Sequence, residues 1–256
     1  MELNRDYESA AIYKWRKKRK KAFVLFICIV GICFLVTRMV RVEDKTTVKV
    51  HNMHTEQNEK AIRYVASNMI KEDPKIAITF DDGPSPAWTP QLLDGLKERN
   101  VKATFFLIGE NAKNNPELVK REAEEGHLIG NHTYHHVEIT RVPDETAQEE
   151  ILMTNEVITG ITGEEVSYMR PPFGVWQKNL ERKLDVMPVL WTIDPLDWTT
   201  DNEDEIINKV VTQAKENDII LLHDCYESSV NAALRIVDIL QKEGFEFVTI
   251  DELIMN

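Results

Sequence analysis

Two adjacent carboxylates, Asp81 and Asp82, directly follow the apolar, strand-like segment KIAITF. Neighbouring carboxylates repel each other, and a bound cation would favour the ionised form of both acids. If Asp82 holds the cation, Asp81 is free to act as a general base toward water. An ordinary Asp-Gly turn without any metal is the alternative interpretation of this segment.

A pair of histidines could supply the other ligands of such a cation. His132 and His136 lie four residues apart in the segment NHTYHH, and residues with this spacing share one face of a helical turn. His135 falls off that face, so we treat it as a bystander. Two histidines and one carboxylate form a standard ligand set for a divalent metal. The alternative is a polar loop that contains histidines by chance.

Three further residues could complete acid–base chemistry beside the metal. Arg170 opens the segment RPPFG, and its guanidinium could hold Asp81 ionised and oriented. His223 ends an apolar run, where it could act as a general acid whose pKa Asp197 tunes. A surface arginine and a satisfied core histidine are the alternatives. A non-haem iron oxygenase shares the ligand set, but the additional base and acid favour hydrolysis.

The elements that must position these residues alternate regularly from Lys75 onward. Apolar, strand-like segments such as KIAITF, ATFFLIG and DIILLHD are separated by amphipathic, helix-like segments, the first of which has Thr89 as its expected N-cap. Repeated strand–helix units predict a parallel sheet with helices outside, and about seven units favour a (β/α) barrel over an open sheet. In either class, side chains at the C-terminal ends of strands form the active site.

Five segments together resemble a known family. In order, TFDDGP, HTYHH, RPPFG, DPLDW and LLHD resemble the motifs of the polysaccharide deacetylases, which form carbohydrate esterase family 4 and share the NodB homology domain. The resemblance covers about residues 75–256 and includes every catalytic motif residue. It implies an α/β fold, a distorted (β/α) barrel of seven or eight units.

The resemblance also implies a role for each matching residue. The implied ligands of a divalent metal, usually zinc with cobalt or nickel as alternatives, are Asp82, His132 and His136. The residues implied in proton transfer are the general base Asp81, oriented by Arg170, and the general acid His223, tuned by Asp197. The residues implied in substrate binding are Phe173, Trp198 and Leu221. Phe173 stands where many members carry Tyr, and a contact through the backbone N–H would tolerate this change.

The implied reaction is metal-dependent removal of acetyl groups from N-acetylglucosamine-type residues of a cell-wall glycan, either peptidoglycan or a chitin-like oligomer, with release of acetate. An O-acetyl esterase acting on xylan-like polysaccharide is one alternative, since the same family contains such enzymes. A non-catalytic wall-binding protein that retains the barrel is another. The sequence does not distinguish among the acetylated sugars and does not determine the oligomeric state.

Charge is distributed unevenly along the 256 residues. The formal net charge is −12, yet residues 1–41 contain 10 Lys and Arg against 3 Asp and Glu. The rest of the chain is therefore strongly acidic, which argues against nucleic-acid binding, since such binding requires a basic face. Of the three cysteines, only Cys225 lies in the acidic part, so no disulfide can form within that part.

A basic segment precedes an apolar one near the N-terminus. As a helix, the uncharged residues 22–37 would span roughly 24 Å, and the flanking basic side chains can extend this toward the roughly 30 Å of a hydrocarbon core. No small-x-small cleavage site follows, so we expect an uncleaved anchor in the cell membrane with its N-terminus in the cytoplasm. The predicted parts are a basic tail at 1–21, a transmembrane helix at 22–40, an extracytoplasmic stalk at 41–74 and the deacetylase domain at 75–256.

Overall fold

The computed structural model describes residues 73–177, 180 and 184–255. The predicted tail and membrane anchor, and nearly all of the predicted stalk, lie outside these residues. Within the described ranges, no helix combines the length and the apolar character that crossing a membrane requires.

The described part is built on one sheet of seven strands, ordered β5-β4-β3-β2-β1-β6, with β7 also paired to β1. Every pair of neighbouring strands is parallel, as the alternation of strand-like and helix-like segments predicts. The strands are β1 (Lys75–Asp81), β2 (Thr104–Leu107), β3 (Leu128–Asn131), β4 (Tyr168–Met169), β5 (Met187–Pro188), β6 (Ile219–His223) and β7 (Glu246–Phe247).

One short segment connects the two ends of this sheet. The backbone N–H of Val189, just after β5, donates to Met169 of β4 over 2.8 Å, and the N–H of Leu221 in β6 donates to the carbonyl of Ile193 over 2.9 Å. The chain from Val189 to Ile193 therefore passes from the β4 side of the sheet to the β6 side. This arrangement is consistent with a distorted (β/α) barrel.

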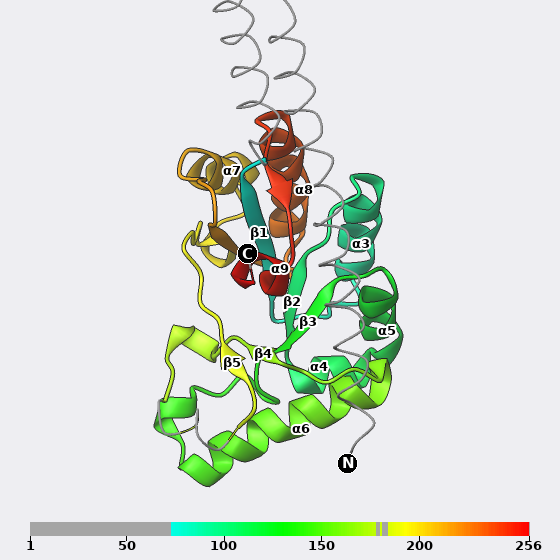
Figure 1. Ribbon diagram of the computed structural model, residues 1–256, viewed down its shortest axis with the longest axis vertical. Coiled ribbons are helices and arrows are strands. Elements are labelled where there is room, and N and C mark those ends of the chain that lie inside the picture. Colours follow the sequence, from blue (N-terminus) through cyan, green and yellow to red (C-terminus); the bar gives the residue numbers. More distant parts are fainter. Residues whose placement is uncertain (1–72, 178–179, 181–183, 256) are drawn as a thin grey trace, which may run out of the picture. The chain divides into compact units, whose positions relative to one another are not determined.

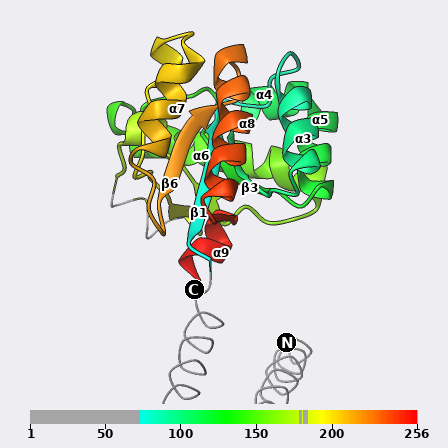
Figure 2. The ribbon, with the colours of Figure 1, turned by 90° about the horizontal axis from the view of Figure 1, so that it is seen from above.

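Helices lie outside the sheet. Figure 2 shows α8 between α7 and α3, in front of β1 and β6, and Figure 1 shows α6 running below the C-terminal ends of β3 and β4. The helices are α3 (Thr89–Glu98), α4 (Gly109–Asn114), α5 (Pro116–Glu124), α6 (Asp144–Thr162), α7 (Glu203–Val211), α8 (Glu227–Lys242) and α9 (Ile250–Ile254).

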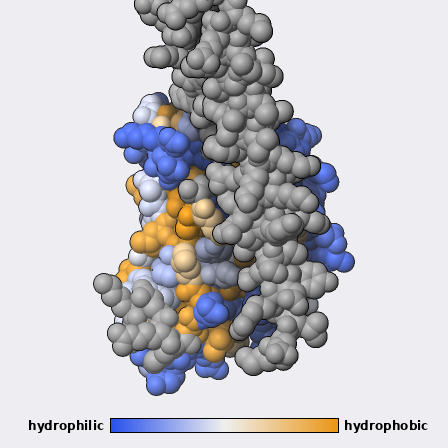
Figure 3. Space-filling model, viewed as in Figure 1, coloured by the Kyte–Doolittle hydropathy of each residue, from blue (hydrophilic) through white to orange (hydrophobic). Residues whose placement is uncertain are grey.

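Strand β1, which leads into the two aspartates, lies at the centre of the core. Residues 76–81 of β1 are all buried, as expected for a central parallel strand that is covered on both faces. Phe80 stacks on Phe105 of β2 with ring centroids 5.3 Å apart. Figure 3 shows hydrophilic residues around the edges of the visible face, with hydrophobic residues gathered between them. Asp81 therefore ends a fully packed strand, and Asp82 follows directly after it.

Candidate active site

The C-terminal ends of neighbouring strands bring the predicted residues together. Asp81 is in register with His223 of β6, and Asn131 of β3, which precedes His132, is in register with Met169 of β4, which precedes Arg170. A pocket of about 420 Å³ opens at this edge, lined by Asp81, Asp82, His132, His136, Pro171, Phe173, Trp191, Asp194, Trp198, Leu221, His223 and Tyr226. A larger cavity of about 880 Å³, between α6 and strands β4 and β5, contains none of the predicted site residues.

Three side chains in this pocket form a group that fits a metal ion. The ligand atoms of Asp82, His132 and His136 all lie within 4.8 Å of one another. The Nε2 atoms of both histidines lie 3.4 Å from Oδ1 of Asp82, and this oxygen is buried without a hydrogen-bond partner. A tetrahedral zinc ion with bonds of about 2.0–2.1 Å would hold its ligand atoms roughly 3.3 Å apart, so the arrangement suits such an ion.

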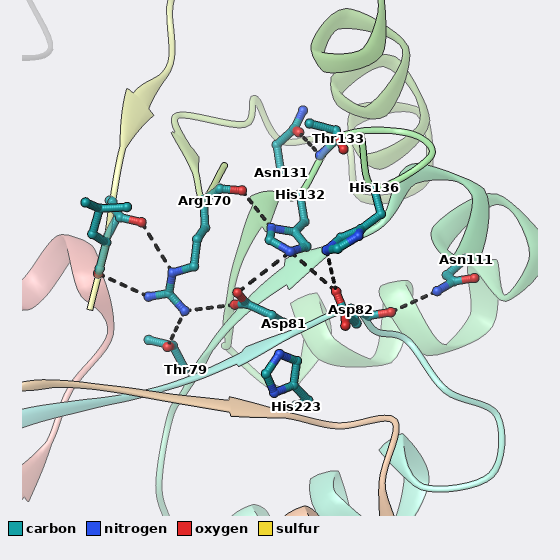
Figure 4. A network of polar contacts seen from close by, with 12 residues as sticks. Thr79, Asp81, Asp82, Asn111, Asn131, His132, Thr133, His136, Arg170 and His223 are labelled. Atoms are coloured by element: carbon teal, nitrogen blue, oxygen red, sulfur yellow. Dashed lines mark hydrogen bonds and ion pairs between the residues drawn. The ribbon is translucent and has the colours of Figure 1, made fainter. Parts of the chain in front are cut away.

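The two histidines meet through a loop, so the expected helical turn was wrong. Residues 132–136 are not helical, and Thr133 and His136 both have positive φ angles, of 61° and 56°. Glu150 of α6 holds this loop, because its Oε2 accepts the backbone N–H groups of Tyr134 and His135 over 3.0 and 2.8 Å. Two left-handed residues thus fold the loop back so that both imidazoles reach Asp82 (Figure 4).

The surroundings of both imidazoles leave Nε2 available for a metal. Nδ1 of His132 lies 2.6 Å from the carbonyl oxygen of Arg170. A carbonyl only accepts, so Nδ1 donates to it, and Nε2 is the ring nitrogen that can bind a metal. Burial lowers the pKa of His136 and so favours its neutral form. His135 points elsewhere, since its Nδ1 lies 2.7 Å from Glu150 and its side chain is 53% exposed, which fits its treatment as a bystander.

Arg170 is completely buried and holds Asp81 in place. Its Nη1 donates to Oδ1 of Asp81 over 2.8 Å and to the Thr79 hydroxyl over 2.7 Å, and its guanidinium lies 4.3 Å from the ring centre of Phe106. Burial lowers the pKa of Arg170, although Asp81 opposes the shift. An arginine normally titrates so far above neutral pH that it stays charged here. The ion pair therefore fixes the orientation of Asp81, whose carboxylate lies at the wall of the pocket.

His223 is held by Asp197 at two points. The Asp197 carboxylate accepts the backbone N–H of His223 and lies equally close, 2.8 Å, to its Nδ1. Burial by itself would lower the pKa of His223, but the hydrogen bond and charge of Asp197, with Asp81 and Asp82, raise it to about 9. This shift favours the protonated imidazole at neutral pH. Figure 4 shows it on the opposite side of Asp81 and Asp82 from His132 and His136.

The three predicted substrate-binding residues all line the pocket. Phe173 has a φ of 62°, and its ring lies against His136 with centroids 5.0 Å apart. Phe173 and Trp198 are 63% and 57% exposed, whereas Leu221 of β6 is 4% exposed. The pocket thus combines a buried apolar wall with two exposed aromatic rings at its rim. Asp194 also lines it, and its Oδ1 accepts the N–H of Leu196 over 2.8 Å.

Several supporting residues escaped the sequence analysis. Asn111 of α4 donates to the backbone carbonyl of Asp82 over 2.8 Å, and Thr79 and Glu150 hold Arg170 and the histidine loop as described above. These are ordinary polar residues in strands and helices, so no spacing in the sequence indicates their role. Cys225 is a free thiol whose pKa burial raises to about 12, which makes it a poor nucleophile.

Gly83 lies directly against a buried carboxylate. A Cβ atom added at this position would overlap the side chain of Asp224, whereas one added at Gly160 of α6 would have no neighbour within 4 Å. We expect Gly83→Ala to lower the free energy of unfolding by about 1–3 kcal/mol, because the turn or the carboxylate must move. The matched substitution Gly160→Ala should be neutral or stabilising by about 0.5–1 kcal/mol. Urea denaturation measures both, and equal stability of the two variants would contradict this packing.

Comparison with known proteins identifies the family. A model of the polysaccharide deacetylase family matches residues 68–189. A Bacillus cereus protein named peptidoglycan-N-acetylglucosamine deacetylase is 39% identical over 199 residues, which are 75% of this chain and 93% of that protein. The chain belongs to the polysaccharide deacetylase family. The family predicted from the five motifs is thereby confirmed.

Two other polysaccharide deacetylases extend the comparison. The Listeria monocytogenes protein named peptidoglycan-N-acetylglucosamine deacetylase PgdA is 38% identical over 216 residues, which are 82% of this chain and 46% of that protein. The chain thus spans about half the length of this relative. The solved structure of peptidoglycan deacetylase PdaC from Bacillus subtilis superposes with a TM-score of 0.70 at 37% identity, covering 71% of this chain and 90% of that one. The deacetylase fold therefore accounts for most of the described residues.

Proposed function

We propose that this chain is a metal-dependent N-deacetylase that hydrolyses the acetamide of N-acetylglucosamine-type residues in cell-wall glycan. One observation carries the proposal. A carboxylate held by a buried arginine and an imidazole held by a buried aspartate line the same pocket as a three-residue group that fits a metal. The names of the relatives, which refer to peptidoglycan N-acetylglucosamine, support the choice of substrate.

Asp81 is the proposed general base. Its Oδ1 is bonded to Arg170, and its Oδ2 lies 3.8 Å from Nε2 of His132, at the edge of the metal group. From this position the free carboxylate oxygen can take a proton from water as the water attacks the acetamide carbon. Arg170 stabilises the ionised form before the transfer and fixes the direction from which the oxygen approaches.

His223 is the proposed general acid. An amine is a poor leaving group unless it is protonated as the carbon–nitrogen bond breaks. Asp197 orients the imidazole through Nδ1, which leaves Nε2–H to face the pocket. Proton transfer from Nε2 to the departing nitrogen releases acetate and a free amino sugar.

The residues Asp82, His132 and His136 would hold the metal, and we propose zinc because imidazole and carboxylate ligands at these separations suit it. When bound there, a divalent cation supplies Lewis acidity toward the acetamide carbonyl and lowers the pKa of water. Leu221 and Trp198 would receive the acetyl methyl group in the apolar part of the pocket. The backbone N–H of Phe173 would donate to the developing oxyanion.

The pH profile should report on His223. A general acid works only while protonated, so turnover should fall as pH rises through the pKa of this group. Asp197→Asn removes the charge that raises this pKa, so the basic limb of the kcat/KM profile should move about 1–2 pH units lower. A bound cation lowers the pKa in both proteins, which leaves their difference in place. An unshifted basic limb in Asp197→Asn would contradict the assignment.

The choice between acetamide and acetyl ester substrates can be tested directly. Purified chain loaded with Zn²⁺ should release acetate from an N-acetylglucosamine oligomer of four or more sugars much faster than from an O-acetylated xylan oligomer. A preference for the ester would establish the O-acetyl esterase alternative. Absence of acetate release from both substrates would favour the non-catalytic alternative.

We also propose a location from the sequence outside the described residues. Residues 22–40, which are apolar except for Thr37 and Arg38, would anchor the chain in the cell membrane with the catalytic domain on the outer side, near wall glycan. Deletion of residues 1–40 should move the protein from the membrane fraction to the soluble fraction. Retention in the membrane fraction would show that another segment or a partner holds it there.

A further inference from the structure

The turn that carries the metal-binding carboxylate adopts a conformation that needs external support. Asp82 has a φ of 72°, in the left-handed region that costs a non-glycine residue about 1–2 kcal/mol. Its side chain must nevertheless keep Oδ1 within reach of two imidazoles. Contacts made by the following residues therefore decide how well the ligand is pre-organised before a metal binds.

Two buried side chains outside the metal group attach to this turn. The hydroxyl of Thr89, the first residue of α3, accepts the backbone N–H of Ser85 over 2.7 Å. In return, the N–H of Thr89 donates to the carbonyl of Ser85 over 3.0 Å. The Thr89 hydroxyl donates in turn to Oδ2 of Asp224, the residue directly after His223, and both Thr89 and Asp224 are 0% exposed.

These contacts also correct the sequence-based expectation for α3. Thr89 does not serve as the N-cap, since Trp88 occupies that position without a capping side-chain hydrogen bond. The Thr89 hydroxyl instead connects the turn after β1 to the residue after β6. A threonine side chain used in this way supports the turn at some expense to the helix start.

Asp224 also contacts the turn directly. Its carboxylate packs so closely on Gly83 that a Cβ atom at this position would force the carboxylate or the turn to move. On the α4 side, the backbone N–H of Ile108 donates to the carbonyl of Gly83 over 3.2 Å, and Asn111 donates to the carbonyl of Asp82 over 2.8 Å. The turn is thus held between α4 and the Thr89–Asp224 pair.

We propose that Thr89 and Asp224 are positioning residues that hold the Asp82 carboxylate ready for the metal. They act through the backbone of residues 83–85, because neither belongs to the three-residue metal group. Outer-shell residues that orient a metal ligand typically contribute about 10–100-fold to metal affinity. The inference rests on the metal site of the proposed function, and it assigns a role to the Asp224 and Thr89 side chains beyond packing.

The first test compares two buried threonines. Thr89→Val removes the hydroxyl that joins Ser85 to Asp224. Thr104→Val removes an equally buried hydroxyl, which in the wild type accepts the N–H of Ile250 over 3.1 Å and lies away from the turn. Competition with a chromogenic chelator should show about tenfold weaker Zn²⁺ binding in Thr89→Val and no change in Thr104→Val. Thr89→Ser, which keeps the hydroxyl, should restore the affinity.

The second test asks whether Asp224 acts through its acceptor oxygen, which supports the turn, or through its negative charge. Asp224→Ala removes the acceptor of the Thr89 hydroxyl and should weaken Zn²⁺ binding by about tenfold or more. Asp224→Asn keeps an acceptor oxygen of the same shape and should bind Zn²⁺ within about threefold of the wild type. The amide has the same shape as the carboxylate without its charge, so this variant isolates the contribution of the acceptor oxygen. The melting temperature of each chelator-treated variant measures any general loss of stability.

The outcomes separate this inference from the proposed function. Weaker Zn²⁺ binding in Thr89→Val and Asp224→Ala, with near-normal binding in Thr104→Val and Asp224→Asn, supports the positioning role. Wild-type affinity in both Thr89→Val and Asp224→Ala overturns it while leaving the metal site intact. An equal loss in Thr104→Val also overturns it, since the effect then reflects stability alone. A wild-type chain that binds no Zn²⁺ overturns the proposed function and this inference together.

Discussion

Replacing Asp81 with asparagine is expected to lower kcat for acetate release by about 10²–10⁴-fold, the usual contribution of a positioned general base. Asparagine has nearly the same shape as aspartate and can still accept from Arg170, so the fold should persist. It cannot take a proton from water, however. The measurement is the rate of acetate release from an N-acetylglucosamine oligomer, with bound Zn²⁺ quantified in the same sample by elemental analysis.

Asp218 offers a matched control for this substitution. It lies just before β6, at the opposite end of that strand from His223. The Asp218 carboxylate accepts the N–H of Lys215 over 2.8 Å, a role that the amide oxygen of asparagine can fill. Asp218→Asn should therefore retain wild-type kcat within about threefold. If Asp81→Asn kept near-native turnover with a full complement of Zn²⁺, the proposed base would be wrong and another group would have to take the proton.

Replacing His132 with alanine is expected to abolish both metal binding and turnover. His132 is one of the three side chains proposed to bind the metal, and it is 3% exposed. Its loss should weaken Zn²⁺ binding by more than the about 10–100-fold that an outer-shell residue contributes. Chelator competition measures the affinity, and acetate release measures the consequence. Added Zn²⁺ should restore little of the lost activity at micromolar concentration.

His135 offers a control for this result within the same loop. Its side chain is 53% exposed and pairs with Glu150, and it lies outside the three-residue metal group. His135→Ala should therefore bind Zn²⁺ with nearly wild-type affinity and keep most of its activity. Stoichiometric Zn²⁺ in His132→Ala, or an equal loss in both variants, would contradict the ligand assignment.

The sequence predicted the parts of the fold that depend on local pattern. Apolar runs of the right length gave the parallel strands, and parallel strands place their C-terminal ends at one edge. This rule predicts that Asp81, His132, Arg170 and His223 share one edge. The strand order, in which β6 neighbours β1 and β4 neighbours β3, decides which of them lie side by side. The sequence could not show how far the sheet closes, because the connection between its ends depends on hydrogen bonds around Val189 and Ile193.

Two local errors have a common physical cause. The four-residue spacing of His132 and His136 fits a loop as well as it fits a helical turn. Hydrogen bonds to Glu150 of α6, 15 or 16 residues further along the chain, hold the loop conformation. Threonine is a common N-cap residue, but Thr89 is the first residue inside α3, and its hydroxyl bonds to Ser85 and Asp224. In both places a carboxylate distant in sequence overrides a local preference, and no pattern within the segment itself indicates it.

Titration of metal-free chain with Zn²⁺, followed by acetate release from an N-acetylglucosamine oligomer, tests the central claim most directly. Asp82, His132 and His136 are proposed to hold one metal ion. The proposed base Asp81 and the proposed acid His223 catalyse hydrolysis only when this ion is bound. Turnover should be near zero after treatment with chelator, rise with added Zn²⁺ and level off at one ion per chain. Turnover that persists in chelator, or that never appears at any Zn²⁺ concentration, would contradict the account.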